Sequence, residues 1–343
     1  MPMQFKQAGK LLFSLSFWVN LLASSVAIAM LACYASPFWW ALAMLEHFRS
    51  QYCLVLTVAL LVGLISRKPW RMTPWSLLWT ILLFANASLL LPLFVGSVQS
   101  AEDATSVAAS PPTLLRVLHT TLNRDNTDIT KAIDYINQQA PDIVSLVEVT
   151  PESLPQFQVG LAGYQLVIGE PRTNSHGSAW FVSKQPSSSV TIQESEVIHL
   201  PANSDRPLVR VTIAIAGKTI ELLCFHAIRP RDANTVNYQQ VEFAALAKWS
   251  QNLLQNGQHN IIAIGDFNST PWYGAFRKLL HDSELINSQN GFGLQPTWHS
   301  GLPALLRLPI DHCLHSRSFI TVDRSIGPNV GSDHLPLLVA LRF

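Results

Sequence analysis

The distribution of apolar residues divides the chain into two parts of different character. Three long apolar runs come first, at residues 11–33, 51–66 and 74–96. The first has 23 residues without a charge, and a helix rising 1.5 Å per residue would cross the roughly 30 Å hydrocarbon core of a bilayer at that length. The second run is shorter, and it spans a bilayer if His47 or Arg49 lies at the interface between membrane and water. The pattern predicts a membrane domain with three transmembrane helices within residues 1–96.

From residue 114 the pattern changes to short apolar runs typical of strands, separated by amphipathic helices. The predicted strands are 114–120, 141–149, 178–184, 208–215, 219–227, 260–267, 309–316 and 334–343. Apolar residues recur at helical spacing within 129–136 and 241–253. Strands dominate, which indicates two packed β-sheets with helices outside, an α/β fold. A linker of small and polar residues, 97–112, joins the membrane domain to the domain predicted at 113–343.

Charge follows the same division. The chain has 23 Lys and Arg and 22 Asp and Glu, or 13% charged residues, against roughly 25% in ordinary soluble domains. Only seven of them lie within residues 1–100. Residues 101–343 carry 17 basic and 21 acidic side chains, so this part lacks the strongly basic balance of a typical nucleic-acid-binding protein.

The basic residues also predict an orientation. Lys6 and Lys10 precede the first apolar run, and the segment 67–71 between the second and third contains Arg67, Lys68 and Arg71. The positive-inside rule places both segments in the cytoplasm. Three crossings then put the second domain outside, in the periplasm if the protein is a multi-pass protein of a bacterial inner membrane. A cleaved signal peptide is the alternative, but three successive apolar runs do not fit a single short hydrophobic region.

Polar residues that end or interrupt the predicted strands are the candidates for chemistry. They are Glu148, Asp266, Asn268, Asp311, Asp333 and His334. A single such acid is most often a turn or capping residue. Carboxylates gathered at strand ends supply the oxygen ligands that a hard cation such as Mg²⁺ prefers.

Four segments carry a resemblance to a known superfamily. PDIVSLVE, GDFNSTP, PIDH and GSDHLP occur in that order, and together they resemble the motifs of the endonuclease/exonuclease/phosphatase superfamily. Its members include DNase I-like nucleases, exonuclease III-like repair enzymes, bacterial sphingomyelinases and inositol-phosphate phosphatases. The resemblance implies a four-layered α/β sandwich, with two packed sheets flanked by helices. It also implies hydrolysis of phosphoester bonds by water, with Mg²⁺ or Mn²⁺ as cofactor.

The resemblance implies that Glu148 and Asp333 bind the metal. The Gln that usually precedes the glutamate is Val147 here, and the Asn that usually ends the first strand is Thr121. Asn123 lies two residues later, on the same face of an extended strand. Either Asn123 takes over as a ligand, or fewer side chains and more water hold the metal.

The resemblance also assigns the catalytic residues. Asp266 and Asn268 match the pair that contacts the scissile phosphate and positions the nucleophile. His334 matches the histidine that acts as general base or stabilises the pentavalent phosphate, and Asp311 the aspartate that orients it. Some members are argued to use the aspartate of GDFN as the base. His226 matches a second histidine that protonates the leaving oxygen or binds phosphate.

Three further residues are candidate substrate contacts. Arg229 follows His226 by three residues and would neutralise a phosphate oxygen, or it is a solvated loop arginine. Asn174 and His176 lie where the superfamily places substrate-contacting residues, although a plain polar loop explains them equally well.

The predicted membrane domain and linker favour one substrate class. Superfamily proteins with three N-terminal helices and an extracytoplasmic domain include glycopeptide-resistance proteins that look like lipid pyrophosphate phosphatases. We therefore expect a phosphohydrolase whose partners are the bilayer and a phosphoester, with a lipid pyrophosphate or a phospholipid headgroup as the leading substrates. The first alternative is an anchored nuclease that uses arginines such as Arg206, Arg210, Arg229 and Arg231. The second is a non-enzymatic membrane protein, supported only by Thr121.

Overall fold

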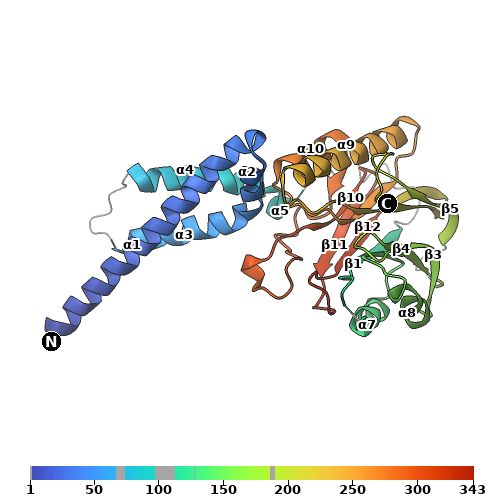
Figure 1. The fold of residues 1–343 in the computed structure, drawn as a ribbon, viewed down its shortest axis with the longest axis horizontal. Helices are drawn as coiled ribbons and strands as arrows, with labels where there is room; N and C mark the ends of the chain where they lie inside the picture. The colour runs from blue at the N-terminus through green and yellow to red at the C-terminus, as the bar shows by residue number, and fades with distance from the viewer. Residues whose placement is uncertain (1, 67–73, 97–112, 127, 186–189) are drawn as a thin grey trace. The chain divides into compact units, whose positions relative to one another are not determined.

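The computed structural model of the protein describes residues 2–66, 74–96, 113–126, 128–185 and 190–343. These residues form two compact units, Met1–Pro92 and Leu93–Phe343, which we describe separately (Figure 1). The predicted linker 97–112 and the basic segment 67–71 lie outside the described residues.

The first unit is helical. Its main helices are α1 (Pro2–Ala32), α3 (Arg49–Ser66) and α4 (Pro74–Leu90). Short helical segments lie between or after them: η1 (Cys33–Phe38), α2 (Trp40–Leu45), η2 (Glu46–Phe48) and α5 (Pro92–Val95). Small and apolar residues of α1, α3 and α4, among them Ala23, Ala27, Ala59 and Leu82, share one buried cluster. Small residues allow such close packing of helices inside a bilayer.

Two segments of this unit are long and apolar enough to cross a membrane, Phe17–Ser36 and Trp40–Ile65. The third predicted span, 74–96, is not one continuous helix. The 17-residue α4 ends at Leu90, because Pro92 has no backbone N–H to continue the ladder and its ring disfavours helix in the preceding residue. The prediction of three spans is therefore corrected to two that satisfy the length, plus one shorter apolar helix.

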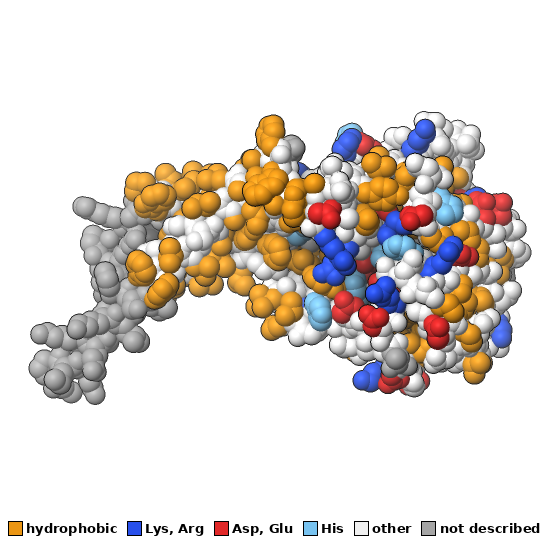
Figure 2. All heavy atoms as spheres, viewed as in Figure 1, with side chains coloured by type: hydrophobic (Ala, Val, Ile, Leu, Met, Phe, Trp, Pro, Cys, Tyr) orange, Lys and Arg blue, Asp and Glu red, His pale blue; other side chains and the backbone are white. Residues whose placement is uncertain are grey.

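The surface and the interior of the helical unit have different chemistry. Large apolar side chains such as Trp18, Ile28 and Phe84 are exposed, and Figure 2 shows hydrophobic side chains over much of its described face. Inside, the buried Arg49 donates a hydrogen bond of 2.7 Å to Oδ1 of Asn86. An apolar exterior with paired polar groups inside is the distribution expected for helices in lipid.

The second unit contains two six-stranded sheets. The first has the order β11-β12-β1-β2-β4-β3 and the second β5-β6-β7-β8-β10-β9. The strands of the first are β1 (Leu114–Thr121), β2 (Ile143–Val147), β3 (Tyr164–Glu170), β4 (Ser178–Ser183), β11 (Ile320–Ile326) and β12 (Leu337–Arg342). Those of the second are β5 (Val190–Ile198), β6 (Leu208–Ile215), β7 (Lys218–His226), β8 (Ile261–Asp266), β9 (Ile286–Asn287) and β10 (Asp311–His315).

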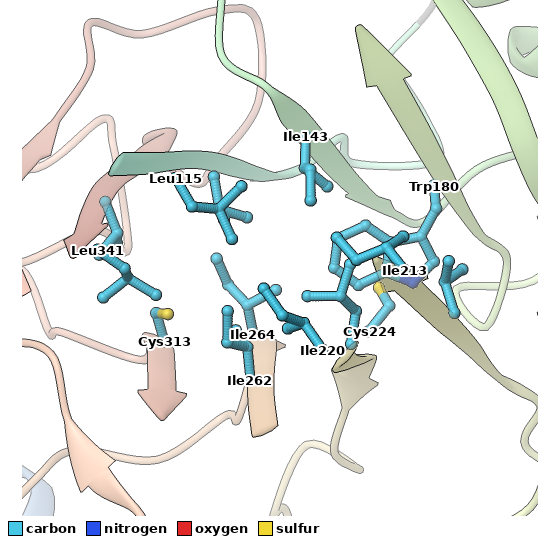
Figure 3. Packing of buried hydrophobic residues seen from close by; sticks show 14 of the residues in the cluster. Leu115, Ile143, Trp180, Ile213, Ile220, Cys224, Ile262, Ile264, Cys313 and Leu341 are labelled. Atoms are coloured by element: carbon cyan, nitrogen blue, oxygen red, sulfur yellow. The ribbon is translucent and has the colours of Figure 1, made fainter. Parts of the chain in front are cut away.

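The two sheets pack face to face over a common apolar core. Leu115, Ile143 and Leu341 of the first sheet face Ile264 and Cys313 of the second (Figure 3). Strands such as β2 and β8 are buried along their whole length, since one face meets the other sheet and the opposite face meets helices. Cys224 and Cys313 are buried free thiols.

Helices cover the outer faces of both sheets. Helices α7 (Thr130–Gln139) and α8 (Ser153–Gly160) pack on the first sheet through a second buried cluster that contains Ile136 and Phe157. Helices α9 (Ala233–Gln255) and α10 (Gly274–Ser283) lie on the opposite side of the unit. Phe243 and Phe276 of these helices contact Phe267, which follows β8. The predicted α/β architecture of two sheets flanked by helices is confirmed.

Each sheet contains one parallel pair, β1 with β2 and β7 with β8. Parallel neighbours end at the same edge of a sheet, which is the usual place for a site in such folds. Of the polar residues singled out above, Glu148, Asp266 and Asn268 lie at or just after these strand ends. Asp311 instead begins β10, and Asp333 and His334 precede β12.

Candidate active site

The backbone register aligns three polar residues across the second sheet. His226 is the last residue of β7, Asp266 the last of β8 and Asp311 the first of β10. His226 pairs in register with Asp266, which also pairs with Asp311. Residues paired across neighbouring strands point to the same face, so hydrogen bonding of the backbone alone groups these side chains.

His334 completes this group from the segment before β12. Its Nδ1 lies 2.8 Å from Oδ2 of Asp311, and its Nε2 lies 3.9 Å from Oδ2 of Asp266. Nε2 of His226 lies 3.6 Å from the same Asp266 oxygen. Asp311 therefore fixes the ring of His334, and the second nitrogen of that ring faces Asp266. Both aspartates and His334 are buried.

Burial and mutual charge set the protonation of this group. Burial raises the pKa of Asp266 to about 8, and the Asp311 carboxylate adds to the rise while His334 opposes it. Burial would lower the pKa of His334, but the Asp311 and Asp266 carboxylates outweigh burial and raise it to about 10. Although burial favours a neutral Asp311, its contacts with His334 and His119 hold its pKa well below the usual range. The electrostatics favour an Asp311 carboxylate paired with a charged His334.

A tight turn after β8 holds Asp266 and Asn268 together. The backbone N–H of Asn268 donates to Oδ1 of Asp266 at 2.7 Å, and its side-chain amide donates to Oδ2 at 3.0 Å. Asn268 adopts a left-handed backbone with φ 48°. Gly265 allows the approach of β7 to β8, because a Cβ there would lie 1.7 Å from the carbonyl oxygen of Phe225. Each residue of the GDFN segment except Phe267 thus has a local role at the site.

Glu148 and Asp333 are held by different partners. Oε2 of Glu148 accepts the backbone N–H of Arg124 at 2.9 Å, and Oδ2 of Asp333 accepts the indole N–H of Trp298 at 3.0 Å. Burial raises the pKa of Glu148, and the nearby Asp333 carboxylate adds to this rise. Glu148 also has a left-handed backbone, with φ 61°. Such strained non-glycine residues often mark functional sites.

The structure corrects the premise on which Asn123 was predicted as a ligand. The strand β1 ends at Thr121, and Asn123 has φ 59°, so it does not continue an extended strand. Its Oδ1 accepts the backbone N–H of Asp125 at 3.1 Å, which closes a turn. Thr121, at the position where the superfamily usually has Asn, donates instead to Oδ1 of Asp311 at 3.1 Å.

His119 extends this network into the core and was not predicted. Its Nε2 lies 3.5 Å from Oδ1 of Asp311, and its Nδ1 lies 3.2 Å from Oγ of Ser145. The His119 ring is fully buried and lies between polar residues of the two sheets. Asp311 therefore contacts three side chains, namely His334 at one oxygen and Thr121 and His119 at the other.

We expect His119→Phe to lower kcat about tenfold and to destabilise the protein by about 1–3 kcal/mol, because it leaves buried polar atoms of Asp311 and Ser145 without this partner. His119→Gln, which keeps a hydrogen-bonding group, should recover part of both losses. Steady-state kinetics and thermal unfolding of the two variants check this. Unchanged kcat in a destabilised His119→Phe protein would limit His119 to packing.

A second pair of histidines is organised by an arginine. Nη1 of Arg206 lies 3.0 Å from Nε2 of His176, its Nη2 donates to the carbonyl of His226 at 3.0 Å, and its Nε lies 3.0 Å from Oε1 of Glu242. Burial and the Arg206 charge lower the pKa of His176 to about 4 and that of His226 well below its usual value. Both rings are neutral near pH 7. The structure therefore places the predicted His176 beside His226, and Arg206 holds the two together.

The remaining predicted substrate contacts lie nearer the surface. The exposed guanidinium of Arg229 lies over the indole of Trp298, 5.0 Å from the ring centroid. Because Trp298 also binds Asp333, this stacking holds Arg229 beside the site. Asn174 is exposed, and its Oδ1 accepts the backbone N–H of His176 at 3.0 Å, so it shapes the loop that carries His176.

The donor set suits a hard divalent cation. Asp266, Asp311 and His334 offer one atom each within 4.8 Å of the others, so this buried group could hold a metal ion. Glu148 and Asp333 add carboxylate oxygens, and the pKa of Glu148 and of Asp266 is raised partly by neighbouring acids. A cation would relieve the repulsion among these buried carboxylates, and oxygen ligands are those that Mg²⁺ and Mn²⁺ prefer.

A sandwich of two sheets with acids and histidines gathered at strand ends is typical of hydrolases that act on phosphoester bonds. The chain belongs to the Endonuclease/Exonuclease/phosphatase family, whose sequence profile matches residues 114–334. The comparison with curated proteins found no match to this chain.

Solved structures with the same fold include the following three. The mannosyl-6-phosphatase of Bacteroides thetaiotaomicron has a TM-score of 0.54 and 17% identity, over 67% of this chain and 100% of that one. A humanized D. rerio TDP2 has a TM-score of 0.53 and 16% identity, over 66% and 98%. The catalytic domain of human Nocturnin has a TM-score of 0.52 and 17% identity, over 67% and 97%. At these identities the likeness establishes the fold alone.

Proposed function

We propose that the protein is a divalent-metal-dependent phosphohydrolase anchored in the membrane, acting on an extracytoplasmic phosphoester such as a lipid pyrophosphate or a phospholipid headgroup. The observation that carries the hydrolase proposal is the Asp311–His334–Asp266 group, in which Asp266 pairs in register with His226. The mannosyl-6-phosphatase shares the fold, which supports phosphate-ester chemistry on this scaffold.

In this proposal each residue of the group has a distinct task. Asp266, whose pKa is raised to about 8, accepts a proton from the attacking water as the water oxygen bonds to phosphorus. The charged His334 donates a hydrogen bond to the phosphate, which stabilises the negative charge of the transition state. Its high pKa favours this role over that of general base. A phosphate leaving group, as in a pyrophosphate, departs from phosphorus without taking up a proton. An alkoxide leaving group instead takes a proton from solvent.

In this proposal Glu148 and Asp333 would hold the metal beside Asp266. When bound it supplies Lewis-acid stabilisation of the phosphate. We expect EDTA to abolish activity of the full-length protein and Mg²⁺ or Mn²⁺ to restore it. Activity that persists in EDTA after dialysis would contradict metal dependence.

The substrate class is tested with full-length protein in nanodiscs against an isoprenoid lipid pyrophosphate, a soluble phosphodiester and plasmid DNA. We expect turnover of the lipid to exceed that of DNA, because two of the four arginines proposed for a nuclease are paired with acids. Arg210 pairs with Glu194, Glu196 and Glu221, and Arg206 with Glu242. Preferential cleavage of DNA would instead support the nuclease alternative.

The proposed orientation requires α4 to make a third crossing. At 17 residues it is shorter than the two segments that are long enough to cross a membrane, and it shares a buried cluster with α1 and α3. We expect a C-terminal alkaline phosphatase fusion, which is active only outside the cytoplasm, to be active. An inactive alkaline phosphatase fusion would leave two crossings and place the catalytic unit in the cytoplasm.

A further inference from the structure

One loop beside the candidate site presents leucines to solvent. We call residues 299–307, which precede β10, the leucine loop. Within it the side chains of Leu302, Leu305 and Leu306 are 41%, 67% and 52% exposed. Single exposed leucines are common, but three within five residues form a local apolar surface, and such surfaces usually mark an interaction site.

The leucine loop has a defined structure that turns these side chains outward. The guanidinium of Arg307 donates to the carbonyl of Leu302 at 2.7 Å and to that of Ser300 at 3.0 Å. A short 3-10 helix, η3 (Ala304–Leu306), forms its tip. The arginine that closes the loop therefore uses its charge to hold the backbone, and the apolar side chains lie outside this turn.

The loop is also bonded to the segment that carries His334. The backbone N–H of Ser300 donates to the carbonyl of Asp333 at 2.7 Å, and Oγ of Ser300 donates to that of Ser332 at 2.7 Å. Trp298, directly before the loop, binds the Asp333 carboxylate and forms a β-bridge with His334. A membrane or protein surface that contacts these leucines would therefore lie next to the candidate active site.

We propose that the leucine loop inserts into the surface of the lipid bilayer and so brings the active site to a substrate within that leaflet. The same chain has two helices long enough to span a membrane. The 16 residues of 97–112 extend at most about 58 Å, which limits how far residue 113 can lie from residue 96. The segment TWHSGLPALLRLPI has no Asp or Glu and one arginine, a composition that suits the boundary between acyl chains and phosphate headgroups. The inference rests on the proposed action on a membrane phosphoester.

Insertion is tested with full-length protein in nanodiscs, labelled with an environment-sensitive fluorophore at Leu305→Cys. The background carries Cys53→Ala, because Cys53 is the one native cysteine that is not buried. We expect lipids with a nitroxide on the acyl chain to quench the label and aqueous iodide to leave it bright. A label at Val159→Cys, 80% exposed on α8, is the matched control and should respond only to iodide.

Two results would overturn insertion. Quenching of the Leu305→Cys label by iodide alone would show that the loop stays in water. Protection from both quenchers would show that protein, such as a second copy of this chain, covers it.

A kinetic experiment tests the same proposal without a label. The double variant Leu305→Asp, Leu306→Asp should lower turnover of a bilayer-embedded substrate about tenfold, the factor expected for burial of about one leucine, and leave turnover of a soluble phosphodiester unchanged. A parallel loss on both substrates would mean that the loop supports the site and does not dock, which contradicts the proposal. If every variant cleaves only the soluble substrate, the proposed lipid substrate fails, and quenching alone decides insertion.

Discussion

The Asp266→Asn variant is expected to lose about 10³-fold in kcat, within the range typical for removal of a general base. The substitution keeps the size of the side chain and removes the carboxylate that both His226 and His334 face. The Asn268 amides, which donate to both Asp266 oxygens, would lose one acceptor. We expect the loss in kcat, with little change in KM, because Asp266 acts on the attacking water and not on the leaving group.

The matched control is Asp134→Asn, an exposed aspartate on α7, which should retain full activity. Circular dichroism and thermal unfolding of both variants establish that the fold is kept. Wild-type turnover by a folded Asp266→Asn protein would remove Asp266 from the mechanism.

The Asp311→Asn variant has the second large effect, seen most clearly in the pH profile. In the wild-type protein, activity needs ionised Asp266 and protonated His334, so the profile should be a bell with limbs near about 8 and about 10. The imidazolium is present below the pKa of His334 and is lost as the pH rises through it. Without the Asp311 charge that pKa falls, and the alkaline limb should move down by about one to three units.

The acid limb of the pH profile should also move to lower pH, since the Asp311 charge raises the pKa of Asp266 in the wild-type protein. The optimum therefore shifts to lower pH, and kcat at pH 9 falls by about 10²–10³-fold. Asp323→Asn, exposed on β11, is the control and should keep the wild-type profile. An Asp311→Asn profile that is lower but not displaced would mean that Asp311 only supports the local structure.

Apolar patterning was sufficient to predict the central strands of both sheets. The prediction for 208–215 matches β6, and those for 114–120 and 178–184 differ from β1 and β4 by one residue. These strands are buried, so their sequences are strongly apolar. The edge strands β3, β5 and β11 were not predicted, because their exposed faces carry polar residues, as in VTIQESEVI of β5. Backbone hydrogen bonds to the neighbouring strand hold such strands in the sheet, and the apolar pattern of the sequence does not reveal those bonds.

The site residues that were predicted share a local signal, a polar residue at the end of an apolar strand. His119, Arg206 and Trp298 contact the site without that signal. His119 lies inside an apolar strand, and its contact with Asp311 joins residues 192 positions apart. Trp298 and Arg206 act through Asp333 and the two histidines. Their roles depend on the packing of one sheet against the other, which no single segment reveals.

The bond between Thr121 and Asp311 joins the two sheets directly at the reacting group. Asp266, Asp311 and His226 belong to the second sheet, whereas Thr121, His119 and Glu148 belong to or follow strands of the first. Neither sheet by itself contains all the side chains of the candidate active site. Fraying of an edge strand such as β5 leaves the reacting group intact, but parting of the sheets dismantles it at once. The fraction of molecules able to turn over substrate is therefore the fraction in which both halves are docked, so selection for activity is at the same time selection for that interface.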